Sequence, residues 1–397
     1  MSGASAGPGA GSARGGHLLA FVSAVVFVDT ALYGVIAPLL PFYSAELALS
    51  KAEAGLLVAA FPAGVILGSF PAGWLVGRIG VRRTAILGLG VFGVSSLVFG
   101  LAEDPALLDL SRLAQGAGSA ASWTAALAWL ANETPAERRG ERLGTAFSAA
   151  VGGALIGPAL GAAARGTDPG VVFAIAASLA LLLIAWTLRM PLPRDAEREL
   201  GWSAAVRERA LLPGTAVIML VGLFFGAIDV LVPLRLDQLG AGGAAIAGGF
   251  ALTSLLQAIA GRPLGRLSDR TGAVRPVQIS LGAGAVLAAL LPLPASVPIL
   301  IGLLALCGPL VGSLLFVPGM KLLSDGAERA GLDQGYAFAI FNLAWAVTMA
   351  GGSAAAGAVA GATSDALAYA LLAAVMGLAL LATLLRTRGL REAVAAG

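Results

Sequence analysis

Three charged residues lie within long apolar stretches of the sequence: Asp29, Arg112 and Asp229. If such a stretch crosses a membrane, a charge at its centre costs roughly 2.5–3.5 kcal/mol, so water or a partner group has to meet it. Removal from water favours the protonated form of a carboxyl group, whereas a bound cation or a neighbouring arginine favours the ionised form. A carboxylate that takes either a proton or a cation couples the movement of the two. Asp29 and Asp229 are therefore candidate sites for both, and Arg112 is a candidate for tuning the carboxylate.

Each of these charges also has a structural interpretation. Asp29 could be a hydrogen-bonding residue or simply the partner of Arg112, and Asp229 could lie too near the outer mouth to bind a solute. Arg112 could form a surface pair with Asp109. The residue types alone leave these alternatives open.

Aromatic and amide side chains near these charges would complete a cation site through cation–π attraction, apolar contact and hydrogen bonds. Spacings of three or four residues place such side chains on one face of a helix. The candidates lie one turn from a carboxylate, on the helical stripe of Arg112, or in two further apolar stretches: Tyr33, Phe225, Trp123, Gln257, Asn342 and Trp345. For each aromatic residue the alternative is ordinary packing or contact with lipid.

The composition indicates that the apolar stretches cross a membrane. Hydrophobic residues make up 58% of the 397 residues and charged residues 12%, against roughly 45–50% and 25% in soluble proteins. The mean hydropathy is +0.89, and a soluble fold could not bury that much apolar surface. This excludes an ordinary cytosolic enzyme, a disordered chain and a nucleic-acid-binding protein. The unbroken apolar runs also argue against a membrane β-barrel.

A helix needs about 20 apolar residues to cross the hydrocarbon core. Charged residues, glycine and proline divide the chain into twelve stretches of this kind. We therefore expect an all-α membrane protein with spans at 18–41, 52–76, 84–102, 106–131, 142–164, 170–189, 211–234, 242–264, 276–295, 298–320, 334–362 and 366–385.

The basic residues predict the orientation of these spans. With both termini in the cytoplasm, the outer loops carry only three of the 25 basic residues, Lys51, Arg165 and Arg235. Arg112 lies in a span, and all the others fall on the inner side. This bias follows the positive-inside rule, so we expect a multi-pass protein of the cell (inner) membrane with cytoplasmic termini.

Two internal matches indicate a duplicated unit. Gly73, Arg78 and Gly80 recur 192 residues later as Gly265, Arg270 and Gly272, and a second match, between 136–147 and 327–338, has an offset of 191. A doubled six-span unit places a solute site between its halves near the membrane midplane. The expected parts are a flexible tail at 1–17, a first half at 18–189, a cytoplasmic linker at 190–210, a second half at 211–386 and a tail at 387–397.

The repeated loop and two further motifs resemble the major facilitator superfamily. Gly73-Trp-Leu-Val-Gly77-Arg78-Ile-Gly80-Val-Arg82-Arg83, with its copy containing Asp269 and Arg270, is similar to the signature G-x-x-x-D-R-x-G-R-R. Arg112-Leu-Ala-Gln115-Gly116 resembles the fourth-span motif, and Gly153-Ala-Leu-Ile-Gly157-Pro158-Ala-Leu-Gly161 resembles the fifth-span motif of drug:proton antiporters. The first span is similar to the vesicular amine transporter branch. The resemblance implies a twelve-helix antiporter in which the loop copies take part in gating and Arg112 takes part in proton coupling.

One position departs from this family pattern. Gly77 stands where the family has aspartate, and only Asp269 in the second copy keeps it. In relatives that aspartate helps to hold the inner side closed, so we expect the second half to carry more of this task. Gly157 and Pro158 permit close approach and remove one helix hydrogen bond, which fits either a hinge or a packing kink.

The remaining features predict no metal and no cofactor. The single cysteine, Cys307, and the single histidine, His17, exclude an internal disulfide, thiolate clusters and histidine-rich sites. A G-x-G-x-x-G match beginning at Gly88 lies inside a span with no strand before it, which argues against a dinucleotide site. No phosphate-binding loop supports ATP-driven transport, so we expect a proton gradient to be the driving force.

Together these features predict a monomeric secondary transporter without enzymatic activity. It would export an amphipathic, cationic small molecule, a drug or an amine, in exchange for protons, within the lipid bilayer and with no nucleic-acid partner. One alternative is a proton- or sodium-coupled symporter, or an exporter of a neutral metabolite or sugar. Another is a non-transporting sensor or lipid scramblase.

Overall fold

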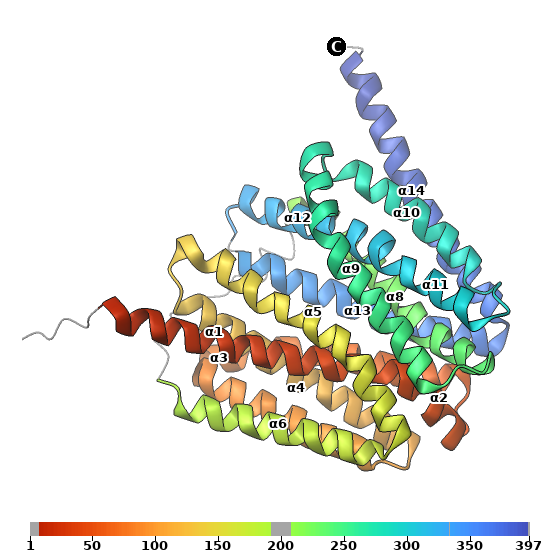
Figure 1. The fold of residues 1–397 in the computed structure, drawn as a ribbon. Coiled ribbons are helices and arrows are strands. Elements are labelled where there is room, and N and C mark those ends of the chain that lie inside the picture. Colours follow the sequence, from red (N-terminus) through yellow and green to blue (C-terminus); the bar gives the residue numbers. More distant parts are fainter. Residues whose placement is uncertain (1–7, 192–207, 333, 396–397) are drawn as a thin grey trace, which may run out of the picture. The chain divides into compact units, whose positions relative to one another are not determined.

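The computed structural model describes residues 8–191, 208–332 and 334–395, and within these ranges every regular element is a helix (Figure 1). The first part of the chain forms α1 (Pro8–Gly34), α2 (Ile36–Glu46), α3 (Lys51–Leu101), α4 (Pro105–Asn132), α5 (Ala136–Gly166) and α6 (Pro169–Arg189). A 3₁₀ turn, η1 (Arg209–Leu211), leads into α8 (Leu212–Gln238), α9 (Gly243–Thr271), α10 (Val274–Leu290) and α11 (Val297–Cys307). The π-helical segment η2 (Gly308–Ser313) is followed by α12 (Leu314–Arg329), α13 (Gln334–Ala362) and α14 (Asp365–Ala395).

Each expected apolar stretch is helical over most of its length in this structure. Within the described residues, nine helices are long and apolar enough to cross a membrane, and α10 is a shorter apolar helix. The 51 residues of α3 contain two expected stretches, 52–76 and 84–102. Gly80 lies between the two stretches with a non-helical backbone, so α3 consists of two helices, each long enough to cross a core about 30 Å thick. The less apolar α4 carries buried polar residues that include Arg112 and Gln115.

Two ends differ from the expected boundaries. The segment expected to be a tail at 1–17 is helical from Pro8, and α14 continues through most of the expected tail at 387–397, as far as Ala395. Proline suits the first position of a helix, and alanine, leucine and arginine favour helix continuation. Most of the expected linker at 190–210 lies outside the described residues.

Contacts within the chain define two units. Unit 1 comprises Met1–Val35 and Ala63–Glu199, and unit 2 comprises Ile36–Pro62 and Leu200–Gly397. The units differ from the expected sequence halves in the segment 36–62, which contains α2 and the start of α3. This segment belongs to unit 2 because α2 packs on α8 and α9, and Gly55 of α3 packs on α13.

Equivalent helix pairs pack closely in each unit. In unit 1, α1 lies along α5 (Figure 1), and in unit 2, α8 lies along α13. A Cβ at Gly153 of α5 would lie 2.6 Å from the Phe27 carbonyl oxygen, and a Cβ at Gly226 of α8 would lie 2.6 Å from that of Met349. A side chain at either glycine would overlap the partner backbone. The two pairs join the expected first and fifth spans and the expected seventh and eleventh spans, so the duplication extends to the packing.

Gly80 and Gly272 end equivalent helical segments in the two repeats. Gly80 interrupts α3 with φ 82° and ψ 162°, and Gly272 follows α9 with φ 76° and ψ 166°. This backbone region is essentially restricted to glycine. The same requirement therefore explains both glycines: each allows the chain to change direction after an apolar helix.

We expect Gly80→Ala and Gly272→Ala each to destabilise the protein, by about 1–3 kcal/mol, because a Cβ strains this backbone conformation. Gly77→Ala is the matched control in the same loop, since Gly77 is helical and a Cβ there meets nothing within 4 Å. The measurement is the thermal unfolding midpoint in detergent. Equal midpoints for Gly77→Ala and Gly80→Ala would contradict the explanation.

Candidate functional site

Helix α1 places Asp29 against α4 within unit 1. Asp29 is 7% exposed, and its side chain interacts with Ser119 and Trp123 and with the charge of Arg112. In the part of the chain that the structure describes, its Oδ1 atom is buried and has no hydrogen-bond partner. A carboxylate oxygen left in this state has capacity for a proton, a water molecule or a cation.

A chain of hydrogen bonds connects Arg112 of α4 to α3 through Gln115 and Ser96. The guanidinium is 1% exposed, and its Nη1 donates to Gln115 Oε1 at 2.9 Å. Gln115 Nε2 donates to Ser96 Oγ at 3.2 Å, and Ser96 Oγ donates to the Phe92 carbonyl at 2.6 Å. The guanidinium carbon also lies 5.6 Å from the centre of the Phe99 ring, within the range of a cation–π contact.

Glycine packing between α3 and α4 makes this chain possible. A Cβ at Gly68 of α3 would lie 2.7 Å from the Ala117 Cα, and a Cβ at Gly118 of α4 would lie 2.6 Å from the Phe92 nitrogen. The two backbones therefore approach closely enough for Gln115 to reach Ser96. Sequence spacing predicted that polar residues share one face of α4. Nothing in the sequence indicated that Ser96, on the neighbouring helix, would bond to Gln115.

An aromatic pair lies beside Asp29. The ring of Trp123 packs on that of Phe147 of α5, with their centroids 5.7 Å apart. The side chain of Trp123 also interacts with the Asp29 carboxyl group. The structure thus brings Asp29, Arg112 and Trp123 together in unit 1 and adds Phe147, which the sequence analysis did not identify. The binding and coupling roles of the three candidates stay predictions.

The fifth-span motif packs against the helix that carries Asp29. A Cβ at Gly157 would overlap the Ala31 carbonyl and lie 3.0 Å from the Gly34 Cα, and Pro158 lies beside Gly34. Helix α5 continues through Pro158. The glycines therefore serve close packing, two residues away from Asp29 along α1.

The other predicted binding residues are partly buried. Tyr33 lies one turn after Asp29 on α1, in unit 1. In unit 2, Phe225 packs on Phe224 at 5.7 Å between ring centroids, and Asp229 lies one turn later on α8. These three stay predictions.

Three further candidates lie on other helices of unit 2. The Gln257 side chain lies against Gly312 of η2, where a Cβ would be 2.7 Å from Gln257 Oε1. Trp345 packs against the apolar cluster of unit 2 that includes Ile218 and Leu323, and Asn342 lies one turn before it on α13. These residues also stay predictions.

The repeated loop is built differently in its two copies. Arg78 lies over the Trp74 ring at 5.0 Å, and Arg82 donates a hydrogen bond to the Leu188 carbonyl at the end of α6. Both residues are on α3, which also contains Gly73.

In the second copy, Asp269 Oδ1 pairs with Lys321 Nζ at 2.8 Å, and the adjacent Arg270 is exposed. The copy that keeps the aspartate therefore has an ion pair between α9 and α12. Within the described residues, no group of three or more His, Cys, Asp or Glu side chains is placed to hold a metal ion.

Comparison with known families identifies the chain. The model of the Major Facilitator Superfamily matches residues 19–349. The protein belongs to the Major Facilitator Superfamily. It is therefore a multi-pass membrane protein of a family of transporters, not an enzyme family.

Curated relatives match part of this superfamily member. Over 157 residues it is 31% identical to "Multidrug resistance protein 2" of Bacillus subtilis (strain 168), covering 40% of this chain and 39% of that protein. Over 149 residues it is 27% identical to "Quinolone resistance protein NorA" of Staphylococcus aureus (strain MRSA252), covering 38% of each. The matched stretches thus span about two fifths of the length of these relatives.

Solved structures match nearly the whole chain. A crystal structure of a POT family transporter in complex with a thioalcohol conjugated peptide superposes with a TM-score of 0.75 at 15% identity, over 94% of this chain and 96% of that one. The nucleoside transporter NupG superposes with a TM-score of 0.73 at 14% identity, over 92% and 99%. These likenesses show the all-helical major facilitator fold.

Gln115→Ala should destabilise the protein by about 1.5–3 kcal/mol, because it removes the neutral partner of a buried guanidinium. Ser96→Ala should cost only about 1 kcal/mol, since it removes the outer bond of the chain and leaves the bond to Arg112 in place. Thermal unfolding in detergent measures both. Equal losses for the two variants would show that Arg112 does not depend on Gln115.

Proposed function

We propose that this transporter exports an amphipathic organic cation in exchange for protons, with Asp29 as the group that binds one or the other. The buried Oδ1 atom of Asp29, which has no hydrogen bond within the described residues, carries this proposal. The ring of Trp123, which interacts with Asp29, packs on the ring of Phe147, and the two rings offer the apolar and cation–π contacts that an amphipathic cation needs.

The coupling would come from competition at one carboxylate. A proton neutralises Asp29 and removes the attraction for the cation, while loss of the proton restores it. Arg112 limits how strongly either ligand is held, because its positive charge already compensates the ionised carboxylate. A proton that enters from outside would therefore release the cation there, and deprotonation on the inner side would prepare the site again.

The proposed arrangement of membrane spans rests on the sequence pattern and on the helices of the structure. Twelve spans in two six-helix halves result if α1 with α2 forms the first span, α3 forms two, and α11 to α12 forms one. The distribution of basic residues supports cytoplasmic termini in a cell (inner) membrane. We propose a monomer whose second half contributes Asp229 and its neighbours, with alternating access between the two sides.

The relatives support a drug-like substrate over the stretch that they share. Their printed names describe multidrug and quinolone resistance, which fits export of amphipathic compounds. The glycines of the fifth-span motif pack α5 onto the helix of Asp29. This motif resembles the one found in drug:proton antiporters.

Asp29→Asn should abolish proton-driven movement of an organic cation, because the amide neither ionises nor exchanges a proton. The measurement is ethidium transport in proteoliposomes with an imposed pH gradient. Asp168→Asn is a control outside the site, at the exposed N-cap of α6, and should keep transport. Transport that survives collapse of the gradient, or an unchanged Asp29→Asn variant, would reject the coupling.

Equilibrium binding of ethidium should weaken as the pH falls, because protons compete for Asp29. The same titration of Asp29→Asn should be flat with pH. A solute that binds equally well to both proteins at both pH values would instead favour a neutral substrate.

Trp123→Leu should weaken ethidium binding by roughly 2- to 30-fold, equivalent to the loss of about 0.5–2 kcal/mol of cation–π attraction. Trp123→Phe keeps an aromatic face and should lose less. Binding measured by fluorescence in detergent distinguishes the variants. Equal losses for Leu and Phe would indicate that Trp123 acts through its size or its indole nitrogen.

A further inference from the structure

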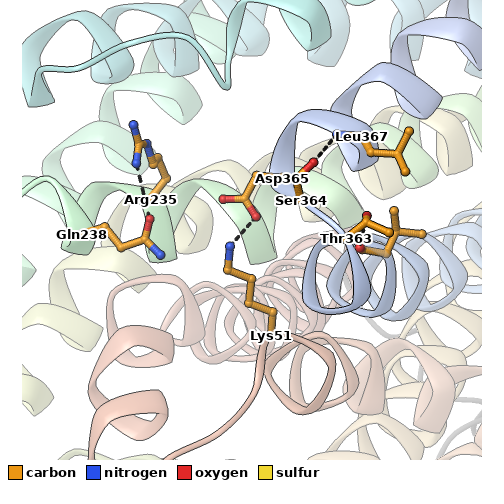
Figure 2. A network of polar contacts seen from close by, with 8 residues as sticks. Lys51, Arg235, Gln238, Thr363, Ser364, Asp365 and Leu367 are labelled. Carbon is orange, nitrogen blue, oxygen red and sulfur yellow. Dashed lines mark hydrogen bonds and ion pairs between the residues drawn. The ribbon is translucent and has the colours of Figure 1, made fainter.

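An ion pair within unit 2 joins the two sequence repeats. Lys51 Nζ lies 2.5 Å from Asp365 Oδ1, and the two side chains are 30% and 22% exposed (Figure 2). Lys51 begins α3 in the first repeat, and Asp365 begins α14 in the second, 314 residues later. The neighbouring Arg235 makes other hydrogen bonds, to Gln238 at 3.5 Å and to the Pro294 carbonyl at 3.4 Å. Both Lys51 and Asp365 fall on the outer side of the proposed topology.

The start of α3 is fixed by a capping box. Ser50 N and Oγ each donate to Glu53 Oε2 at 2.7 Å, and Glu53 N donates to Ser50 Oγ at 3.3 Å. This cap makes Lys51 the first residue of the helix. A positive charge at a helix N-terminus is unfavourable, and the carboxylate of Asp365 compensates it.

The start of α14 is fixed by a single N-cap hydrogen bond. Only Thr363 and Ser364 separate α13 from α14, and Ser364 Oγ accepts a hydrogen bond from Leu367 N at 3.3 Å. Asp365 lies in the first turn of α14, where the helix dipole favours a negative charge. Both members of the ion pair are therefore held on capped helix starts.

Next to the ion pair, α3 packs closely on α13, and at Gly55 there is no room for a side chain. A Cβ at Gly55 of α3 would lie 2.7 Å from the Ser353 carbonyl oxygen and 3.0 Å from the Gly357 Cα of α13. A Cβ at Gly361 would lie 3.9 Å from the Ala52 Cβ. We call this surface, together with the ion pair, the outer contact.

We propose that the outer contact is a lock that keeps the outer side closed, and that it has to separate each time the transporter opens outward. This rests on the proposed function, because alternating access requires the two repeats to part at the outer end. Lys51 is the only lysine that links the repeats. The other lysine, Lys321, pairs with Asp269 within the second repeat.

A cysteine pair measures how often the outer contact is made. Ala52→Cys with Gly361→Cys, in a Cys307→Ala background, matches the Cβ separation of about 3.5–4.5 Å that a disulfide requires. A protease site inserted at 192–207 separates the repeats after cleavage, so a disulfide within one chain holds the two fragments together on a gel. Brief oxidation in membranes then gives a cross-linking rate that needs no substrate.

We expect rapid cross-linking, and a rate about two- to five-fold lower in Lys51→Ala and in Asp365→Asn, the range that corresponds to an ion pair of this exposure. Lys51→Asp combined with Asp365→Lys should recover the rate. Glu53→Gln is the matched control, because Glu53 is an adjacent charge whose hydrogen bonds go to Ser50. Absence of cross-linking, or equal rates in Lys51→Ala and Glu53→Gln, would overturn the proposal.

The cross-linked protein should stop ethidium counterflow, and a thiol reductant should restore it, while each single-cysteine variant keeps transport. Counterflow at the full rate with the disulfide closed would overturn the lock. If the cross-linking rates follow the charges but no proton gradient drives ethidium, the proposed function fails and the lock stands. The two failures are therefore distinguishable.

Discussion

The cost of a charge in a low-dielectric interior is the constraint on which the site depends. Asp29 and Arg112 are both nearly inaccessible in unit 1, and each would be expensive there without the other charge or a polar partner. The hydrogen-bond chain through Gln115 to Ser96 holds the guanidinium at α4. Asp29 Oδ1 has no hydrogen bond within the described residues. A carboxyl group can gain or lose a proton, whereas an arginine stays charged, so in the proposed mechanism the carboxylate is the group that exchanges its partner.

Close packing at glycine residues allows the buried charges to reach their polar partners. Polar side chains such as Gln115 are short, so they can satisfy a buried charge only if neighbouring backbones approach closely. Gly68 and Gly118 bring α3 to α4, and Gly153 and Gly157 bring α5 to α1. The same kind of pairing recurs between α8 and α13. Glycine therefore acts in this protein mainly through close approach, and only at a few chain reversals through its backbone freedom.

The two ion pairs made by lysine show how a duplicated fold can use similar charges for different tasks. Lys321 and Asp269 connect α12 to α9 within one repeat, on the side that the loop motif occupies. Lys51 and Asp365 connect the two repeats. Only a contact of the second kind is sensitive to separation of the repeats. The segment 36–62 belongs to unit 2 because this contact and the packing of α2 hold it there.

The sequence by itself predicted the apolar helices, the duplication, the family resemblance and the shared helix face of Arg112 and Trp123, because hydropathy, offsets and helical spacing are local properties of the chain. It did not predict that α14 extends to Ala395. Only the tertiary structure showed three further contacts between helices: Ser96 with Gln115, Phe147 with Trp123, and Asp365 with Lys51. These partners come from different helices, 19 to 314 residues apart for the two polar pairs. Whether these partners come into contact depends on how closely the helices pack at glycine residues. The spacing of residues along a single helix does not contain that information.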